Sequence, residues 1–317
     1  MHNKLAIVIP FFKIHFIEKT LKSLAGQTDK RFNLYIGNDA SLSDPRELIR
    51  YNLKDIDFKY FDYKENLGSK NLTLSWERLI DETQDEPYIY ILGDDDFVDD
   101  NFVEEFYKII EQNKNVHLIR YSGVLVDDND RKTNRISVYP AQQNFDELTE
   151  EVFSGKIRSS LSENIFSREM YEKHGFKKYP LAWCSDTKLW LDIAYEHPVF
   201  SIQDSVVHTR NGATNISGNK KLNNIKNLSS LLFRIDSLNE YNLKDKAKKN
   251  ILKELRYFTS KNKFVDKEIV CKYLKNKNIG IIIKLKYFFF FIYKLIKYRN
   301  LYNENKVREL TAYYFRK

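Results

Sequence analysis

The sequence is poor in cysteine, with only Cys184 and Cys271 among its 317 residues. No disulfide framework is therefore expected, and the chain suits a reducing compartment. There is also no room for a secretory signal peptide, because the first strand that the sequence predicts begins at Leu5. We therefore expect a cytoplasmic protein. The chain is long enough for one main domain with a full core, followed by an appendage.

The sequence also lacks an uninterrupted apolar run long enough to cross a bilayer. The most apolar segment, 279–298, contains four lysines, whereas a spanning helix needs about 20 predominantly apolar residues. On a helix, Lys286, Lys294 and Lys297 fall within one arc, and Lys284 falls outside it. Lysines beside a face of Phe, Tyr and Ile favour a helix that lies in the interface of an anionic membrane. The alternative is a helix packed on the main domain with snorkelling lysines.

Charge is distributed unevenly along the chain. Residues 219–317 contain 25 Lys and Arg against 8 Asp and Glu, a net charge of +17, whereas residues 1–218 carry a net charge of −9. Gly218 marks the expected boundary between a main domain, 1–218, and a basic helical C-terminal region, 219–317. No nucleic-acid-binding motif accompanies the basic residues, so we expect no nucleic acid and a peripheral position on the inner face of the plasma membrane. Within the basic region the pattern predicts helices over 228–238, 245–259 and 266–274.

The N-terminal hundred residues alternate between short apolar runs and segments with helical spacing. This alternation predicts an α/β fold with a doubly wound, mostly parallel sheet. In the helix expected at 71–80, the predicted buried residues are Leu72, Leu74, Trp76 and Leu79. The other predicted elements are strands at 5–9, 32–38, 58–61 and 88–93, a helix at 16–24 and a helix that follows Pro45.

Three consecutive carboxylates, Asp94, Asp95 and Asp96, follow the strand expected at 88–93. They repel one another, so a fold that gathers them needs a cation, hydrogen bonds or open water. Ligands bind at the carboxyl ends of the strands in such sheets, and Asp39 follows the second strand in the same way. Hard oxygen ligands suit Mg²⁺ or Mn²⁺, which typically bridge one or two carboxylates to substrate phosphates. The alternative for the triplet is a solvated acidic turn that caps the next helix.

Six segments together resemble the family 2 glycosyltransferases, which have the GT-A fold. The resemblance covers residues 3–217. Two positions depart from the family pattern: Ser185-Asp186 stands where a carboxylate pair is usual, and Asp100 replaces a common proline. The segments that carry the resemblance are IVIPFF (7–12), LKSLAGQT (21–28), NDASLSD (38–44), ENLG (65–68), GDDD (93–96) and CSDTKLWL (184–191).

The resemblance implies a nucleotide-sugar donor, with a UDP-sugar expected, and assigns residues to its binding. Asp39 would hydrogen-bond the base or ribose, although an aspartate here could also cap a helix or a turn. Asn66 and Gly68 match the family's Asn-x-Gly turn at the donor site. Pro10 and Phe11 would line the nucleotide pocket, or else serve as strand-end packing.

The same resemblance implies a divalent metal, Mg²⁺ or Mn²⁺, held against the donor diphosphate by Asp94 and Asp96, with Asp95 nearer the sugar. His208 would complete the metal shell, although a lone histidine is more often a packed or capping residue. Arg210 would clamp the diphosphate, because a guanidinium matches phosphate geometry.

Asp186 matches the position of the family's catalytic base, which takes the proton from the acceptor hydroxyl. Its alternative is the N-cap of a helix over 187–195. The resemblance thus implies an inverting glycosyltransferase that acts on a glycan or lipid-linked acceptor in cell-surface polysaccharide synthesis.

Two other functions are weighed against this one. A nucleotidyltransferase would show a Gly-rich phosphate loop after the first strand, where Pro-Phe-Phe-Lys stands at 10–13. A non-catalytic nucleotide-sugar or glycan-binding module is disfavoured by the presence of Asp94, Asp96 and Asp186.

Overall fold

The computed structural model describes residues 3–155, 159–212 and 215–261. Contacts divide the chain into two units. The first consists of Met1–Lys177 and Ser185–Leu222, and the second of Lys178–Cys184 and Asn223–Lys317.

The first half of the sheet is parallel and has the strand order β3-β2-β1-β4. Ile7 of β1 pairs with Leu34 of β2 on one side and with Tyr90 of β4 on the other. β1 is apolar on both faces because it lies between neighbours in the middle of the sheet. The bounds are β1 Leu5–Phe11, β2 Phe32–Asn38, β3 Phe58–Asp62 and β4 Tyr88–Ile91, which confirms the four predicted strands.

The second half of the sheet is mixed. β8 lies antiparallel between β4 and β6, and β9 runs parallel to β6. The two shortest strands, β5 and β7, pair antiparallel with β9. The antiparallel β8 was not predicted, since its four residues form no apolar run. The bounds are β5 Phe97–Val98, β6 Leu118–Val126, β7 Gln142–Gln143, β8 Asn164–Ser167 and β9 Val199–Arg210.

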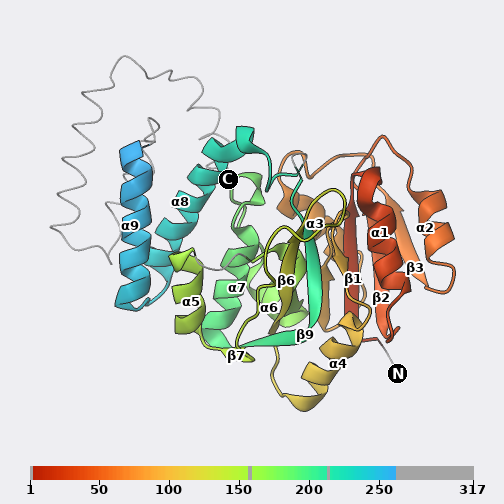
Figure 1. Cartoon of the computed structure of the whole chain (residues 1–317), viewed down its shortest axis with the longest axis horizontal. Helices are drawn as coiled ribbons and strands as arrows, with labels where there is room; N and C mark the ends of the chain where they lie inside the picture. The colour runs from red at the N-terminus through yellow and green to blue at the C-terminus, as the bar shows by residue number, and fades with distance from the viewer. Residues whose placement is uncertain (1–2, 156–158, 213–214, 262–317) are drawn as a thin grey trace. The chain divides into compact units, whose positions relative to one another are not determined.

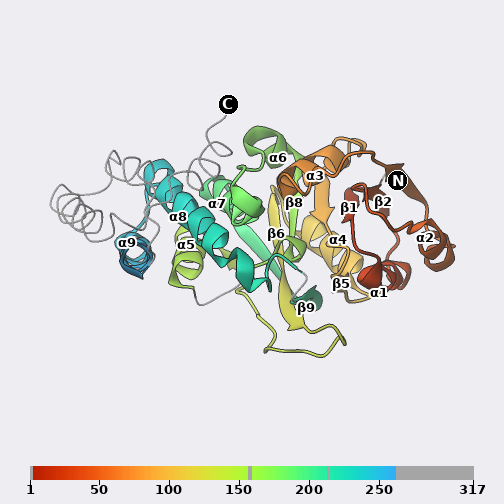
Figure 2. The same ribbon diagram turned by 90° about the horizontal axis from the view of Figure 1, so that it is seen from above.

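Helices cover both faces of the sheet, as seen in Figures 1 and 2. On one face, α1, α2 and α4 bury their apolar residues against alternate positions of β1 and β2. On the other face, Leu79 of α3 contacts Gly37 of β2, and Trp190 of α7 packs on Phe166 of β8. The α/β architecture predicted from the sequence is therefore confirmed. The helices of this unit are α1 Ile14–Ala25, α2 Arg46–Asn52, α3 Leu72–Ile80, α4 Phe102–Gln112, α5 Phe145–Ser154, α6 Arg168–His174 and α7 Ser185–Glu196, with short 3-10 turns at Leu161–Glu163 and Lys220–Leu222.

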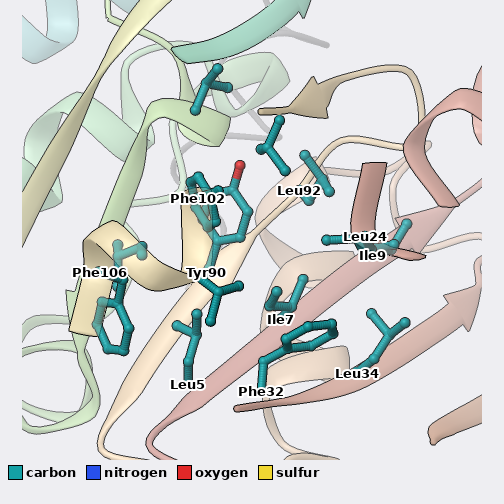
Figure 3. Close-up of a cluster of buried hydrophobic side chains, with 14 of the residues drawn as sticks. Leu5, Ile7, Ile9, Leu24, Phe32, Leu34, Tyr90, Leu92, Phe102 and Phe106 are labelled. Carbon is teal, nitrogen blue, oxygen red and sulfur yellow. The ribbon is translucent and has the colours of Figure 1, made fainter. Parts of the chain in front are cut away.

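Figure 3 shows the core on the α1 and α4 face of the sheet. The side chains of Ile7, Tyr90 and Phe102 are fully buried there. Burial of an aliphatic or aromatic side chain of this size contributes roughly 1.5–3 kcal/mol, so this layer fixes β1 and β4 in register. The carboxyl ends of these two strands are consequently rigid.

The prediction for the buried face of α3 was partly wrong. Trp76 and Leu79 are buried as predicted, but Leu72 and Leu74 are only half-buried. The helix is capped by Asn71, whose side chain accepts a hydrogen bond from the Thr73 N–H. Leu72 shares the face of Trp76 and Leu79 but is the first residue of the helix, whereas Leu74 lies on the opposite side.

The second unit contains helices α8 (Asn223–Glu240) and α9 (Asp245–Lys261), which confirm the helices predicted over 228–238 and 245–259. A short turn at Pro180–Ala182 packs against α8, where Ser229 Oγ donates to the carbonyls of Pro180 and Trp183. The predicted helices at 266–274 and 279–298, and Cys271, lie outside the described residues. Among the described residues, no helix has the length and apolarity needed to cross a membrane.

Candidate active site

The carboxyl ends of β1, β2 and β4 meet at one edge of the sheet because these strands are parallel neighbours. The Asp39 N–H donates to the Phe11 carbonyl at 2.9 Å, so the end of β2 is joined to the end of β1. On the other side of β1, the N–H groups of Phe12 and Lys13 both donate to Asp94 Oδ2, at 2.7 and 2.6 Å. The structure therefore brings Asp39 and the acidic triplet to the same edge, on either side of β1.

Two carboxylates of the triplet are buried and hydrogen-bonded, with exposed fractions of 8% for Asp94 and 6% for Asp96. Asp96 Oδ2 accepts from the Ser162 hydroxyl at 2.6 Å, and its Oδ1 accepts from the Arg210 N–H at 2.8 Å. The alternative of a solvated acidic turn is therefore wrong for Asp94 and Asp96, because both carboxylates are buried and accept hydrogen bonds from the protein. Ser162 was not singled out in the sequence, where nothing local connects it to a strand end elsewhere in the chain.

The triplet carries negative charge that its surroundings only partly offset. Burial, and then repulsion from Asp95, raise the pKa of Asp94 to about 6. Burial also raises the pKa of Asp95, although Lys13 and Arg210 act in the opposite direction. Carboxylates with raised pKa values in such a place attract a further cation.

Asp39 is buried at the end of β2 and holds the turn that follows β3. Its two carboxylate oxygens accept from the N–H groups of Leu67 and Gly68, at 3.0 and 2.8 Å. Arg78 of α3 also donates to this carboxylate, and its guanidinium lies 3.7 Å from the centre of the Tyr63 ring. The role of Asp39 towards a base or ribose stays a prediction. No pattern in the sequence pointed to Arg78 as its partner.

The turn beside Asp39 requires glycine at position 68. A Cβ atom on Gly68 would lie 2.6 Å from Asp39 Oδ2, closer than real Cβ contacts allow. Asn66 stabilises the same turn, because its Oδ1 accepts from the Ser69 N–H at 2.7 Å. Asn66 and Gly68 thus belong to the turn that binds Asp39, and their role towards a nucleotide sugar stays a prediction.

The residues at the end of β1 differ in exposure. Phe11 is fully buried in the core, which favours the packing alternative for its side chain. Pro10 is half-buried. Phe12 is 47% exposed, and its carbonyl accepts from the Ser41 hydroxyl at 2.7 Å. Phe12 is therefore an exposed aromatic residue at the strand-end edge, which the sequence analysis had not assigned to the site.

His208 lies on β9 beside β5, away from the triplet in its described contacts. Its Nε2 is 2.9 Å from Asp99 Oδ1, and its ring stacks on Phe97 with centroids 4.4 Å apart. For His208 to reach a metal at Asp94 or Asp96, the contact with Asp99 would have to be exchanged. Its metal role stays a prediction.

The buried guanidinium of Arg210 is directed at protein groups. Its Nε donates to the Asp95 carbonyl at 3.1 Å, and its terminal nitrogens donate to the Asp127 carbonyl and the Asp130 carboxylate. It also lies 4.0 Å from the centre of the Phe16 ring. In this arrangement Arg210 connects the triplet to the turn at 127–130, and a role as diphosphate clamp would require it to release Asp130.

Asp186 is half-buried in the first turn of α7. The helix begins at Ser185, so the alternative that placed Asp186 at its N-cap is wrong. The Thr187 hydroxyl lies 3.3 Å from Asp186 Oδ1. A carboxylate in the first turn is favoured by the helix dipole, which explains an aspartate here without testing its catalytic role.

The acidic triplet fits a hard divalent cation by the chemistry of its donors. Among the residues that the structure describes, no three His, Cys, Asp or Glu side chains gather as a complete metal cage. Mg²⁺ and related ions commonly take only one or two carboxylates from the protein and the remaining ligands from phosphates and water. The buried carboxylate oxygens of Asp94 and Asp96 are donors of the kind that such a shared site uses.

Comparison with known proteins identifies the family. The model of glycosyl transferase family 2 matches residues 6–175. The chain belongs to glycosyl transferase family 2. The chain is also 30% identical, over 114 residues, to an uncharacterized glycosyltransferase of Rickettsia bellii. The match covers 35% of this chain and 15% of that protein, so the chain spans a small part of its relative.

Two solved structures share the fold of this family 2 enzyme. Staphylococcus aureus TarS 1–349 in complex with UDP-GlcNAc has a TM-score of 0.60 at 12% identity, over 86% of this chain and 79% of that one. The mannosyltransferase PcManGT of Pyrobaculum calidifontis in complex with GDP-Man and Mn²⁺ has a TM-score of 0.54 at 12% identity, over 98% and 84%. At these identities the likeness shows the fold alone, and it agrees with the GT-A architecture that the sequence implied.

Proposed function

We propose that this glycosyltransferase is an inverting, metal-dependent enzyme that moves a sugar from a nucleotide-diphosphate sugar to a hydroxyl of a glycan or lipid-linked glycan in cell-surface polysaccharide synthesis. The observation that carries the proposal is the buried acidic triplet beside Asp39, at the carboxyl edge of β1, β2 and β4, in a chain of this family. The fold neighbours support the donor class, since TarS was solved with UDP-GlcNAc and PcManGT with GDP-Man and Mn²⁺.

In this proposal one side of β1 binds the nucleoside. Asp39 accepts a hydrogen bond from the base or ribose, next to the turn that contains Asn66 and Gly68. Pro10 and the backbone of Phe11 form the adjoining wall. The donor hydroxyls or ring N–H would have to share Asp39 with the turn that it already holds.

The other side of β1 holds the diphosphate and a divalent cation. Asp94 and Asp96 would hold the cation, with Asp95 nearer the sugar, and His208 and Arg210 are further candidates for the metal and the diphosphate. When bound, the cation would offset the charge that develops on the leaving diphosphate. The protein's own contribution is a fixed, largely buried set of carboxylates that costs no rearrangement during reaction.

Asp186 is the proposed base. Its carboxylate would take the proton from the acceptor hydroxyl as that oxygen attacks the sugar from the face opposite the diphosphate. A positioned base of this kind contributes about 10²–10⁴-fold to the rate. The basic region 219–317 would meet the anionic inner face of the membrane, where lipid-linked acceptors would be available.

The test is a donor screen with the full-length protein, which measures hydrolysis of nucleotide sugars with Mn²⁺, with Mg²⁺ and in excess chelator. We expect at least one UDP- or GDP-sugar to be hydrolysed only when a divalent cation is present. Asp96→Asn should lose most turnover, whereas Asp81→Asn, at an exposed aspartate after α3, should not. Full activity in excess chelator would refute the metal dependence, and no hydrolysis of any donor would refute the donor class.

A further inference from the structure

Lys13 lies next to the acidic triplet and contacts it in two ways. Its backbone N–H donates to Asp94 Oδ2 at 2.6 Å, which fixes the start of its side chain at the end of β1. Its ammonium nitrogen Nζ lies 3.8 Å from Asp95 Oδ2. The same nitrogen donates to Asn215 Oδ1 at 2.7 Å, and Asn215 in turn donates to the Arg210 carbonyl at 3.0 Å. An amide and a carboxylate therefore hold the ammonium beside the triplet.

The charge of Lys13 acts on the triplet more directly than that of Arg210. Arg210 is buried and paired with Asp130, and its Nε donates to the carbonyl of Asp95 and not to the carboxylate. Lys13 is 31% exposed, on a flexible stem, and its ammonium acts to lower the pKa of both Asp94 and Asp95. It thus supplies positive charge at a place where a divalent cation would supply more.

We propose that the Lys13 ammonium is a resident counter-ion of the acidic triplet, whose positive charge beside Asp95 opposes the binding of a divalent cation at Asp94 and Asp96, so that Lys13 sets the affinity of the site for metal. This inference rests on the metal dependence of the proposed function. A lysine is suited to the role because its compact charge is carried on a flexible four-carbon stem, while its hydrogen bond to Asn215 keeps the ammonium beside the triplet.

The test measures Mn²⁺ binding to the full-length protein without donor, by electron paramagnetic resonance of the free ion. Lys13→Gln removes the charge but keeps the backbone N–H that binds Asp94 and a side chain that can reach Asn215. We expect it to lower the Kd for Mn²⁺ about tenfold, the effect of one partly screened charge. Lys13→Met should give the same gain, and Lys13→Arg should stay within about twofold of the wild type. Thermal unfolding would confirm that each variant is folded.

Lys19→Gln is the matched control, because it removes a lysine of α1 whose ammonium pairs with Asp130 at 3.6 Å and not with the triplet. It should leave the Kd unchanged. An equal gain in Lys19→Gln would assign the effect to net charge and overturn the proposal, as would unchanged or weaker binding in Lys13→Gln. If the wild type binds no Mn²⁺, the inference fails, while nucleotide-sugar hydrolysis in excess chelator would still report whether the transferase function stands.

Discussion

Replacing Arg78 by methionine should destabilise the protein through Asp39. The change keeps an apolar stem of similar length but removes the guanidinium, which lies over the Tyr63 ring and is the cation beside a carboxylate whose side chain is 6% exposed. Removal of one partner from a buried ion pair typically costs about 3–5 kcal/mol, because the other charge stays buried. The N–H groups of Leu67 and Gly68 still bind Asp39, so we expect the lower end, about 3 kcal/mol in the free energy of unfolding.

The measurement is urea unfolding of Arg78→Met, Asp39→Asn and the double variant. In Asp39→Asn an amide replaces the carboxylate that now accepts from two N–H groups, so this single change should also destabilise. Because the two side chains contact each other, their effects should not add, and we expect a coupling energy of about 2 kcal/mol. Calorimetric measurement of UDP binding separates a structural role of Asp39 from a role in binding the nucleoside. If Asp39 binds the nucleoside, Asp39→Asn should lower the affinity for UDP more than Arg78→Met does.

Arg46→Met is the matched control, since Arg46 pairs with Asp44 at 2.6 Å but is 54% exposed at the surface. An exposed pair of this kind contributes about 0–1 kcal/mol. A coupling energy between Arg78 and Asp39 no larger than that of the surface pair would show that the contact does not stabilise the fold, and would refute the reasoning.

Three further predictions concern other parts of the chain. Burial, and then the neighbouring His197, lower the pKa of His117, so the folded state binds fewer protons than the unfolded state. The free energy of unfolding should therefore fall as the pH drops below about 6.5. In urea unfolding, His117→Asn should flatten this pH dependence, whereas His15→Asn, at an exposed histidine, should not. Asp186→Asn should abolish sugar transfer with nearly unchanged donor affinity, and a collapse of affinity would make Asp186 a binding or structural residue. Deletion of residues 279–317 should release the protein from anionic vesicles in a flotation assay and leave activity on a soluble acceptor intact, whereas unfolding of the truncated chain would mark the segment as part of the core.

Local pattern was sufficient to predict the parallel half of the sheet. β1 and β2 are buried on both faces, so β1 appears in the sequence as a continuous apolar run and β2 as an apolar run interrupted by Asn33. The site at their carboxyl ends followed from the same logic, because acids after neighbouring parallel strands must meet at one edge. Asp39 and Asp94 do lie on either side of β1.

The short strands in the mixed half of the sheet had no comparable signal. β8 is four residues long, and β5 has only two, Phe97 and Val98. Such strands are specified by their neighbours in the sheet and not by a run of their own. Leu74 shows the same limit within a helix, because a leucine in the sequence does not tell which side of α3 packs on the sheet, and Leu74 lies opposite Trp76 and Leu79.

The hydrogen-bond partners of the site residues could not be predicted from local sequence patterns, for a related reason. Arg78, Ser162 and Arg210 each contact an aspartate that is far away in sequence, and each lies on an element whose place is set by packing. Nothing near Ser162 in the sequence marks it as a donor to Asp96. The position of α3 beside β2 brings Arg78 to Asp39, and the positions of the turn Leu161–Glu163 and of β9 bring Ser162 and Arg210 to Asp96.

The three aspartates of the triplet consequently make different structural contacts. Substitutions of the three residues are therefore expected to have different effects on stability. Asp94 joins β4 to the end of β1 through two backbone N–H groups, and Asp96 joins it to β9 through the Arg210 N–H. Asp95 instead faces the Lys13 ammonium. Substitution of Asp94 or Asp96 therefore removes a tie between strands as well as a candidate metal ligand, whereas Asp95→Asn should change charge with little loss of stability. Loss of activity at Asp96 is evidence for metal binding only where the free energy of unfolding is unchanged and Mn²⁺ affinity has fallen.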